Sequence, residues 1–123
     1  MNMAARSIAP KKAMSDYAQK LKVCGHPLRL ALLCTIAHQN DLCVSELWEC
    51  VDQPQPVVSQ HLAVLKDKGL VKSEVQGNKR IYSIADPFVK EMIDLMEKDH
   101  RSKHPATALS PEAYTSNKSS GSV

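Results

Sequence analysis

The cysteines of this chain are the side chains best suited to soft-metal or redox chemistry, and three of them form a candidate site: Cys24, Cys43 and Cys50. Thiolates are the ligands that soft ions prefer. Cys24 is expected just before a helix start, where a thiol pKa can be lowered. Cys43 and Cys50 are seven residues apart, so an intact helix would hold their backbones roughly 10 Å apart and exclude a disulfide. The pattern predicts a site for a soft metal or metalloid ion such as As(III), or for a redox or persulfide signal.

A second group of functional residues lies between residues 55 and 84, where the pattern is typical of DNA binding. Three apolar residues recur at helical spacing, while Ser59 and Gln60 fall off their stripe and are expected to face outward. Turn residues and cations follow at Gln76–Lys79, which predicts a hairpin with a charged tip. The segment holds five cations against two acids, a balance that favours a phosphate backbone. The apolar residues are Val58, Leu62 and Leu65, and the cations are Lys66, Lys68, Lys72, Lys79 and Arg80.

The apolar periodicity of the rest of the chain predicts the scaffold that positions these residues. We expect a first helix capped by Ser15 and ending near Cys24–Gly25, and a second that begins at Pro27, buries one face and ends near His38. A third, short helix is expected over residues 44–51. The prolines at 54 and 56 then separate it from the DNA-facing helix, which Gly69 ends.

Strands are expected over residues 70–75 and 80–84, followed by a last helix with Asp86 as N-cap and Pro87 as its first residue. The order helix, helix, helix, helix, hairpin, helix predicts a mostly α protein with a β-hairpin wing, a winged helix-turn-helix. The last helix is apolar over a wide arc and needs a partner surface. We therefore expect a homodimer formed through the first and last helices.

Length and composition predict one domain with a modest core. The chain has 123 residues and a net charge of +3, which alone is weak evidence for any partner. We expect a flexible arm over residues 1–13, the domain over residues 14–103 and a disordered tail over residues 104–123. No apolar run approaches the length that spans a bilayer, and the N-terminus lacks the apolar core of a secretory signal. These features predict a cytoplasmic protein with reduced cysteines.

Four motifs resemble the ArsR/SmtB family of bacterial repressors over roughly residues 17–98. They are Gly25–Leu30 (GHPLRL), Leu42–Leu47 (LCVSEL), Val58–Leu65 (VSQHLAVL) and Gly69–Val71 (GLV), and the basic hairpin continues them. The resemblance implies a homodimer that binds a palindromic operator in double-stranded DNA and blocks transcription until a ligand releases it.

The resemblance also implies which residues touch DNA: Gln55, Ser59, Gln60 and His61 on the helix, and Lys79 and Arg80 in the wing. Gln can form a bidentate contact with adenine, Ser can bond several base edges, and the cations add affinity through counterion release. For His61 a packing role is the alternative, because it lies three residues from Val58 on the core side. Pro54 and Pro56 replace the Ser-x-Ser more usual in the family, so a hydroxyl helix cap is lost.

The sensing sites of the family are incomplete in this sequence. Of its arsenic-binding thiols only Cys43 remains, and the zinc site on the last helix keeps Asp86 but has Phe88, Asp99 and Ser102 at its other positions. Cys34 matches one half of a redox pair whose second cysteine is missing, and its apolar neighbours favour a buried packing role. His100 and His104 have the i, i+4 spacing of metal ligands, but a polar helix end explains them as well.

Three alternatives stay open beside the inducible repressor. One is a regulator of this type without a metal inducer of its own, and another is a winged helix used only for protein–protein contact. The third is an enzyme built on Cys24, His26 and Cys43. The sequence has neither a glycine-rich phosphate loop nor paired Cys-x-x-Cys ligands, which argues against that third alternative.

Overall fold

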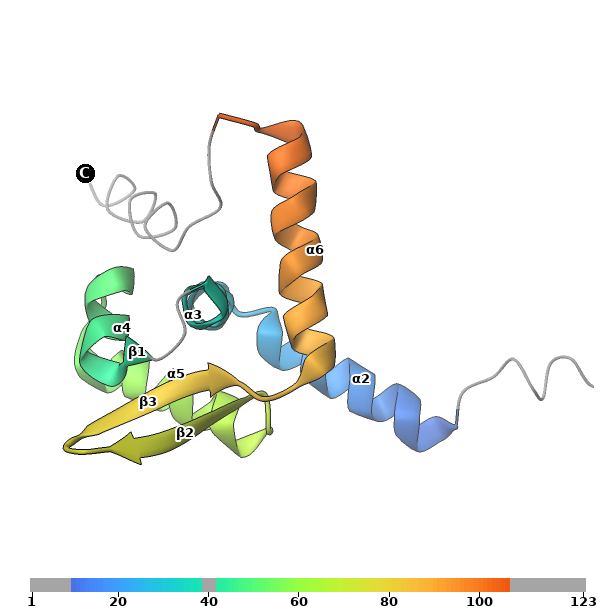
Figure 1. The fold of residues 1–123 in the computed structure, drawn as a ribbon. Helices are drawn as coiled ribbons and strands as arrows, with labels where there is room; N and C mark the ends of the chain where they lie inside the picture. Colours follow the sequence, from blue (N-terminus) through green and yellow to red (C-terminus); the bar gives the residue numbers. More distant parts are fainter. Residues whose placement is uncertain (1–9, 39–41, 107–123) are drawn as a thin grey trace, which may run out of the picture.

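The computed structural model describes residues 10–38 and 42–106. For residues 42–45 it describes the backbone but not the side chains. It confirms the mostly helical fold with a β-hairpin wing (Figure 1). The helices are α2 (Lys11–Cys24), α3 (Pro27–His38), α4 (Val44–Val51), α5 (Gln55–Asp67) and α6 (Pro87–Lys103), and the strands are β1 (Leu42–Cys43), β2 (Val71–Gln76) and β3 (Lys79–Ile84). No helix in the described residues is both long and apolar enough to cross a membrane.

Helix α3 is the centre of the core. It contacts α2, α4, α5, α6 and β3, and Leu32, Leu33 and Ile36 are each no more than 1% exposed. The expectation that this helix buries a single face was too narrow, because Leu33 and Cys34 are buried as well as the predicted stripe. A helix that is apolar around most of its circumference must be covered from several sides.

Helix α2 begins five residues earlier than the sequence predicted, at Lys11 and not after Ser15. The expected cap at Ser15 was wrong: the N-cap is Pro10, whose carbonyl accepts a hydrogen bond from the Met14 N–H at 3.1 Å. Residues 11–13, assigned to the flexible arm, are therefore helical. The lysines, alanine and methionine of this first turn are good helix formers, which explains the earlier start. Residues 1–9 of the arm and residues 107–123 of the tail lie outside the described residues, and the domain division remains a prediction.

Helices α4 and α5 form the expected helix-turn-helix pair. Between them Asp52 has a φ of 51°, a left-handed conformation that makes a tight turn. Pro54 is the N-cap of α5 and gives it no side-chain hydrogen bond, so this helix lacks a hydroxyl cap, as predicted. Gly69, with a φ of 76°, follows the end of the helix as predicted. The Leu70 N–H then donates to the Leu65 carbonyl at 3.0 Å and closes the last turn.

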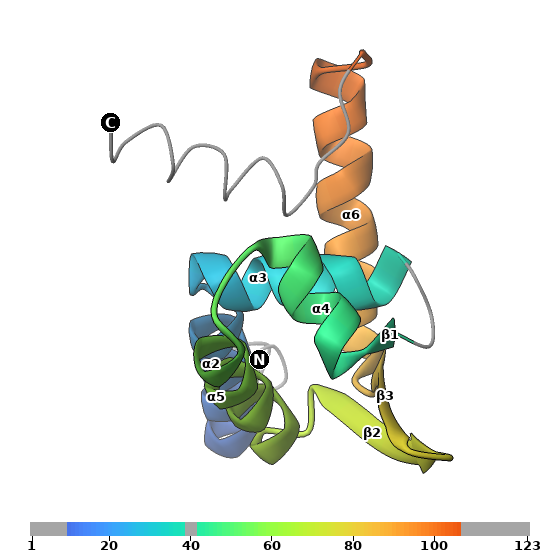
Figure 2. The ribbon, with the colours of Figure 1, turned by 90° about the vertical axis from the view of Figure 1, so that its left-hand side faces the viewer.

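The sheet has the strand order β1-β3-β2, and all its pairs are antiparallel. Gln76 pairs with Lys79, so the hairpin turns through Gly77 and Asn78, with Gly77 at a φ of 65°. Strand β1 was not predicted; Leu42 and Cys43 extend the sheet by pairing with Tyr82 and Ile81. In both views the hairpin and α5 lie on the lower side of the molecule, and α6 rises away from them (Figures 1 and 2).

The start of α6 is fixed to α2 through Asp86. As predicted, Asp86 is the N-cap, and its Oδ1 accepts a hydrogen bond from the Val89 N–H at 3.1 Å. Its Oδ2 lies 2.6 Å from the Lys20 Nζ. Beside this ion pair the rings of Tyr17 and Phe88 meet edge to face, with centroids 5.2 Å apart. A capped helix end, an ion pair and an aromatic contact therefore join the two helices at one point.

We predict that Asp86→Ala lowers the free energy of unfolding by about 1–2 kcal/mol, because the helix loses its cap. Burial alone raises the pKa of Asp86, but the bonds from Lys20 and the Val89 N–H outweigh it and hold that pKa below its ordinary value of 3.8. A carboxyl with a depressed folded pKa stabilises the fold above its unfolded pKa, and this contribution is lost as the pH falls through the folded pKa.

Urea unfolding at pH 7 and at pH 2.5 measures both effects. Asp86→Asn keeps a cap acceptor and should lose less stability than Asp86→Ala at pH 7, and the gap between wild type and Asp86→Ala should narrow at pH 2.5. Asp99→Ala, which removes an exposed pair with Lys103 at the other end of α6, is the control. A gap that stays constant with pH would contradict the assignment.

Candidate DNA-binding surface and thiol groups

The outward face of α5 carries the polar groups that the sequence assigned to base reading. Gln55, Ser59 and Gln60 are exposed, and the apolar side of the same helix is fully covered: Val58, Leu62 and Leu65 are at most 1% exposed. Packing against α3 and α4 therefore fixes which side of α5 faces solvent. The exposed amides and hydroxyl can donate to and accept from base edges.

The hairpin presents cations beside this helix. Lys72, Lys79 and Arg80 are exposed, and the Arg80 Nη1 donates to the Ser73 Oγ across the two strands at 3.1 Å. That bond restrains the guanidinium before any ligand arrives. Val75, near the hairpin tip, is 64% exposed. A restrained cationic hairpin suits sequence-independent contact with a phosphate backbone.

His61 does not share the outward orientation of its neighbours. Its ring is half-buried, and its Nδ1 accepts a hydrogen bond from the Arg29 Nε at 3.1 Å. The His26 ring lies 4.5 Å away, centroid to centroid. Burial first, and then the nearby His26 and Arg29, lower the pKa of His61. These contacts favour the packing alternative for His61, while its contact with DNA stays a prediction. Sequence reasoning missed Arg29, which lies 32 residues away along the chain.

The cysteines lie in different environments. Cys24 is the last residue of α2 and is 3% exposed. Burial, and then the charge of Asp86, raise its pKa, so the expectation of a lowered thiol pKa at this position was wrong. Burial and then Glu97 raise the pKa of Cys34 to about 11, and this residue is also buried, which agrees with its predicted packing role.

Cys50, on α4, is half-buried. Cys43 contributes its backbone to β1, and its side chain lies outside the description. Among the side chains that the structure describes, no group of three or more histidine, cysteine, aspartate or glutamate residues is placed to hold a metal ion. A site that joins Cys24, Cys43 and Cys50 therefore stays a prediction.

Comparison with known proteins decides the family. The sequence model described as "Bacterial regulatory protein, arsR family" matches residues 26–73. The uncharacterized HTH-type transcriptional regulator MJ1325 of Methanocaldococcus jannaschii is 38% identical over 80 residues, which cover 65% of this chain and 90% of that protein. The chain belongs to the arsR family of bacterial regulatory proteins. This family consists of DNA-binding transcriptional repressors, which are not enzymes.

Two further relatives carry more specific names. The arsenical resistance operon repressor of Escherichia coli K12 is 36% identical over 59 residues, which cover 48% of this chain and 50% of that protein. The crystal structure of the transcriptional repressor PagR of Bacillus anthracis is similar at a TM-score of 0.66 and 32% identity, and covers 71% of this chain and 99% of that one.

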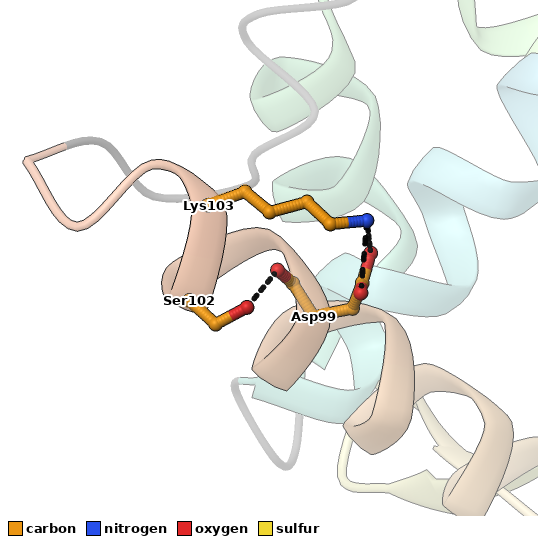
Figure 3. Close-up of polar contacts among 3 residues, drawn as sticks. All are labelled: Asp99, Ser102 and Lys103. Carbon is orange, nitrogen blue, oxygen red and sulfur yellow. Dashed lines mark hydrogen bonds and ion pairs between the residues drawn. The ribbon is translucent and has the colours of Figure 1, made fainter.

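In this arsR-family chain the residues at the zinc positions of the last helix have other partners. Asp86 binds Lys20 and caps α6, and Phe88 packs on Tyr17. Figure 3 shows the other end of α6, where the Ser102 Oγ donates to the Asp99 carbonyl at 2.9 Å and the Lys103 Nζ pairs with the Asp99 carboxylate at 3.2 Å. The rings of His100 and His104 lie 4.8 Å apart.

The thiol environments predict an order of reactivity. The thiolate is the nucleophile, and burial with a raised pKa suppresses it, so Cys50 should react with iodoacetamide at pH 7.5 at least about tenfold faster than Cys24 or Cys34. Peptide mass spectrometry after timed alkylation measures the order, and the same reaction in urea, where all thiols should react alike, is the control. Faster labelling of Cys24 in the folded protein would contradict the burial argument.

Proposed function

We propose that this protein is a homodimeric transcriptional repressor that binds a palindromic operator in double-stranded DNA through α5 and the β2–β3 hairpin. One observation carries the proposal: a helix with an exposed polar face and a cationic hairpin lie on the same side of the molecule (Figures 1 and 2). Such a helix suits the major groove, and the hairpin suits the adjacent backbone.

The roles of the side chains follow from their chemistry. Gln55, Ser59 and Gln60 would read bases, since an amide can bond adenine bidentately and a hydroxyl can bond several base edges. Lys79 and Arg80 would neutralise phosphates and release counterions, which makes affinity depend steeply on salt. The repressor names of the relatives from E. coli and B. anthracis support the direction of regulation.

Exposed apolar side chains on α2 and α6 support the dimer. Met14, Tyr17 and Leu21 are 60%, 49% and 50% exposed and follow one face of α2 at i, i+3 and i+7, and Leu95 on α6 is 67% exposed. Exposed apolar side chains grouped on the face of a helix favour a partner that covers them. A second copy that covers these faces would form a two-fold dimer, and the paired α5 helices of such a dimer require two half-sites in inverted repeat.

We also propose that a thiol-reactive signal, such as arsenite or another soft metal ion, releases the repressor. Cys50 is half-buried on α4, and Cys43 directly precedes that helix. Since α4 packs against α5, ligation there can shift the DNA-binding helix. The arsenical resistance operon repressor among the relatives supports this chemistry. Cys24 contributes less, because it is buried and its pKa is raised.

Fluorescence anisotropy with a duplex from the protein's own promoter tests DNA binding. Loss of a base contact costs about 1–3 kcal/mol, so Gln60→Ala and Ser59→Ala should weaken the specific site about tenfold and leave non-specific DNA nearly unchanged. Lys79→Ala should weaken both and reduce the salt slope by about one unit. Lys98→Ala, an exposed cation on α6, is the matched control.

Absence of DNA binding would contradict the proposal and favour a winged helix used only for protein–protein contact. Binding that does not depend on salt would contradict the phosphate contacts assigned to the hairpin. The same measurement in 50 mM and 200 mM salt, with reduced protein, distinguishes the DNA-binding proposal from the protein–protein alternative.

The inducer is tested by adding As(III), Cd(II), Zn(II) and a persulfide donor to the preformed complex. We expect one of these agents to release the DNA, and Cys43→Ser or Cys50→Ser to abolish the release without changing the starting affinity. Cys34→Ser, at a buried cysteine outside the proposed site, is the control. Unchanged release in both variants would discard these thiols, and tight binding under all agents would favour a regulator without a metal inducer.

A further inference from the structure

A cluster of three basic side chains joins the DNA-facing helix to the centre of the fold. Arg29, in the first turns of α3, donates from its Nε to the His61 Nδ1 on α5 at 3.1 Å. Its Nη1 lies 3.5 Å from the carbonyl of Val23, in the last turn of α2. His26, between α2 and α3, stands with its ring 4.5 Å from that of His61. One guanidinium therefore ties together the end of α2, the start of α3 and the middle of α5.

This geometry determines which ring nitrogen of His61 carries no proton. A ring nitrogen that accepts a hydrogen bond carries no hydrogen, so the Arg29 contact requires an unprotonated Nδ1 on His61. His26 obeys the same rule, because its Nδ1 accepts from the Leu28 N–H at 3.1 Å. Protonation of His61 would turn the acceptor into a donor and place a cation against Arg29. The contact therefore exists only while His61 is neutral.

The groups that act on His61 reinforce this state. From α3 it faces Arg29, and from the segment between α2 and α3 it faces His26. Within residues 10–38 and 42–106, these two are the charged or titratable groups that act on its ring. Both are cationic or become so on protonation. Acidification consequently adds positive charge to a cluster that already holds a guanidinium, and like charges within a few ångströms repel.

We propose that Arg29 is a positioning residue for DNA recognition, and that its contact with neutral His61 holds α5 in its binding orientation and is broken by mild acid. The inference rests on the proposed function, since it assumes that α5 reads DNA. His61 directly follows Gln60 and lies two residues after Ser59, so a shift of α5 at this point moves the reading side chains. The Arg29–His61 contact can therefore set the affinity for DNA although neither Arg29 nor His61 needs to touch DNA.

The direction of the pH effect follows from the fold. The pKa of His61 lies below the ordinary histidine value of 6.5. Near and below pH 6.5, His61 is therefore protonated more readily in the unfolded chain than in the folded protein. The contact therefore contributes fully above about pH 6.5 and is lost as the pH falls through the folded pKa. Phosphate electrostatics alone predicts the opposite, because added positive charge tightens DNA binding. Weaker DNA binding in acid would thus distinguish the effect of the Arg29–His61 contact from that of the overall positive charge.

Matched substitutions isolate the two halves of the contact. Asn places its Oδ1 near the position of the histidine Nδ1, so His61→Asn keeps an acceptor that cannot gain a proton. Gln places its Nε2 near the position of the arginine Nε, so Arg29→Gln keeps a hydrogen-bond donor. Arg29→Met has a side chain about as long as that of glutamine but no donor. His104→Asn, beyond the end of α6, is the histidine control.

The experiment measures the affinity of each variant for the promoter duplex at pH 7.5 and 5.5, at constant ionic strength, with circular dichroism as the check on folding. A hydrogen bond to a charged group is worth enough to change affinity about tenfold. Wild type and His104→Asn should bind more weakly at pH 5.5, by up to about tenfold. His61→Asn should change less than about twofold, Arg29→Met should bind about tenfold more weakly at both pH values, and Arg29→Gln should recover affinity at pH 7.5.

Two outcomes would overturn the inference alone: a wild-type pH profile in His61→Asn, or wild-type affinity in folded Arg29→Met. If Arg29→Met does not fold, the profile of His61→Asn and the recovery by Arg29→Gln still decide the question. Absence of DNA binding by wild type at pH 7.5 would instead overturn the proposed function, and the inference with it.

Discussion

The burial of α3 is the constraint on which the rest of the structure depends. Leu32 and Ile36 share one side of this helix and Leu33 points to another, yet all three are excluded from water. Helices α2, α4, α5 and α6 and strand β3 must therefore each cover part of it. Burying such a side chain contributes about 1.5–3 kcal/mol relative to exposure. Each covering element is thereby oriented, since its apolar side must face α3 and its polar side must face outward.

That orientation divides the surface into regions with different tasks. The polar face of α5 and the cationic hairpin are exposed on one side, while α6 extends away from them (Figure 1). Arg29 and Asp86 fix the angles between elements at two points, one toward α5 and one toward α6. The arsR-family fold thus supports recognition with a rigid centre, and polar contacts at its edges set the geometry of the functional helix.

Much of this fold could be predicted from local sequence. The stripe of Val58, Leu62 and Leu65 and the Asp86 cap are signals within one element, and the structure confirms them. Strand β1 was missed because it is only two residues long and exists through pairing with β3. The Arg29–His61 bond joins residues 32 positions apart, and the raised pKa of Cys24 depends on burial and on Asp86. Neither leaves a local pattern.

The claim that α5 and the hairpin together form the DNA-binding surface is tested most directly by backbone amide chemical shifts on addition of the promoter duplex. The account predicts the largest changes at Ser59, Gln60, Lys79 and Arg80, with the outer half of α6 nearly unchanged. Changes concentrated along α6, with α5 and the hairpin unaffected, would contradict it.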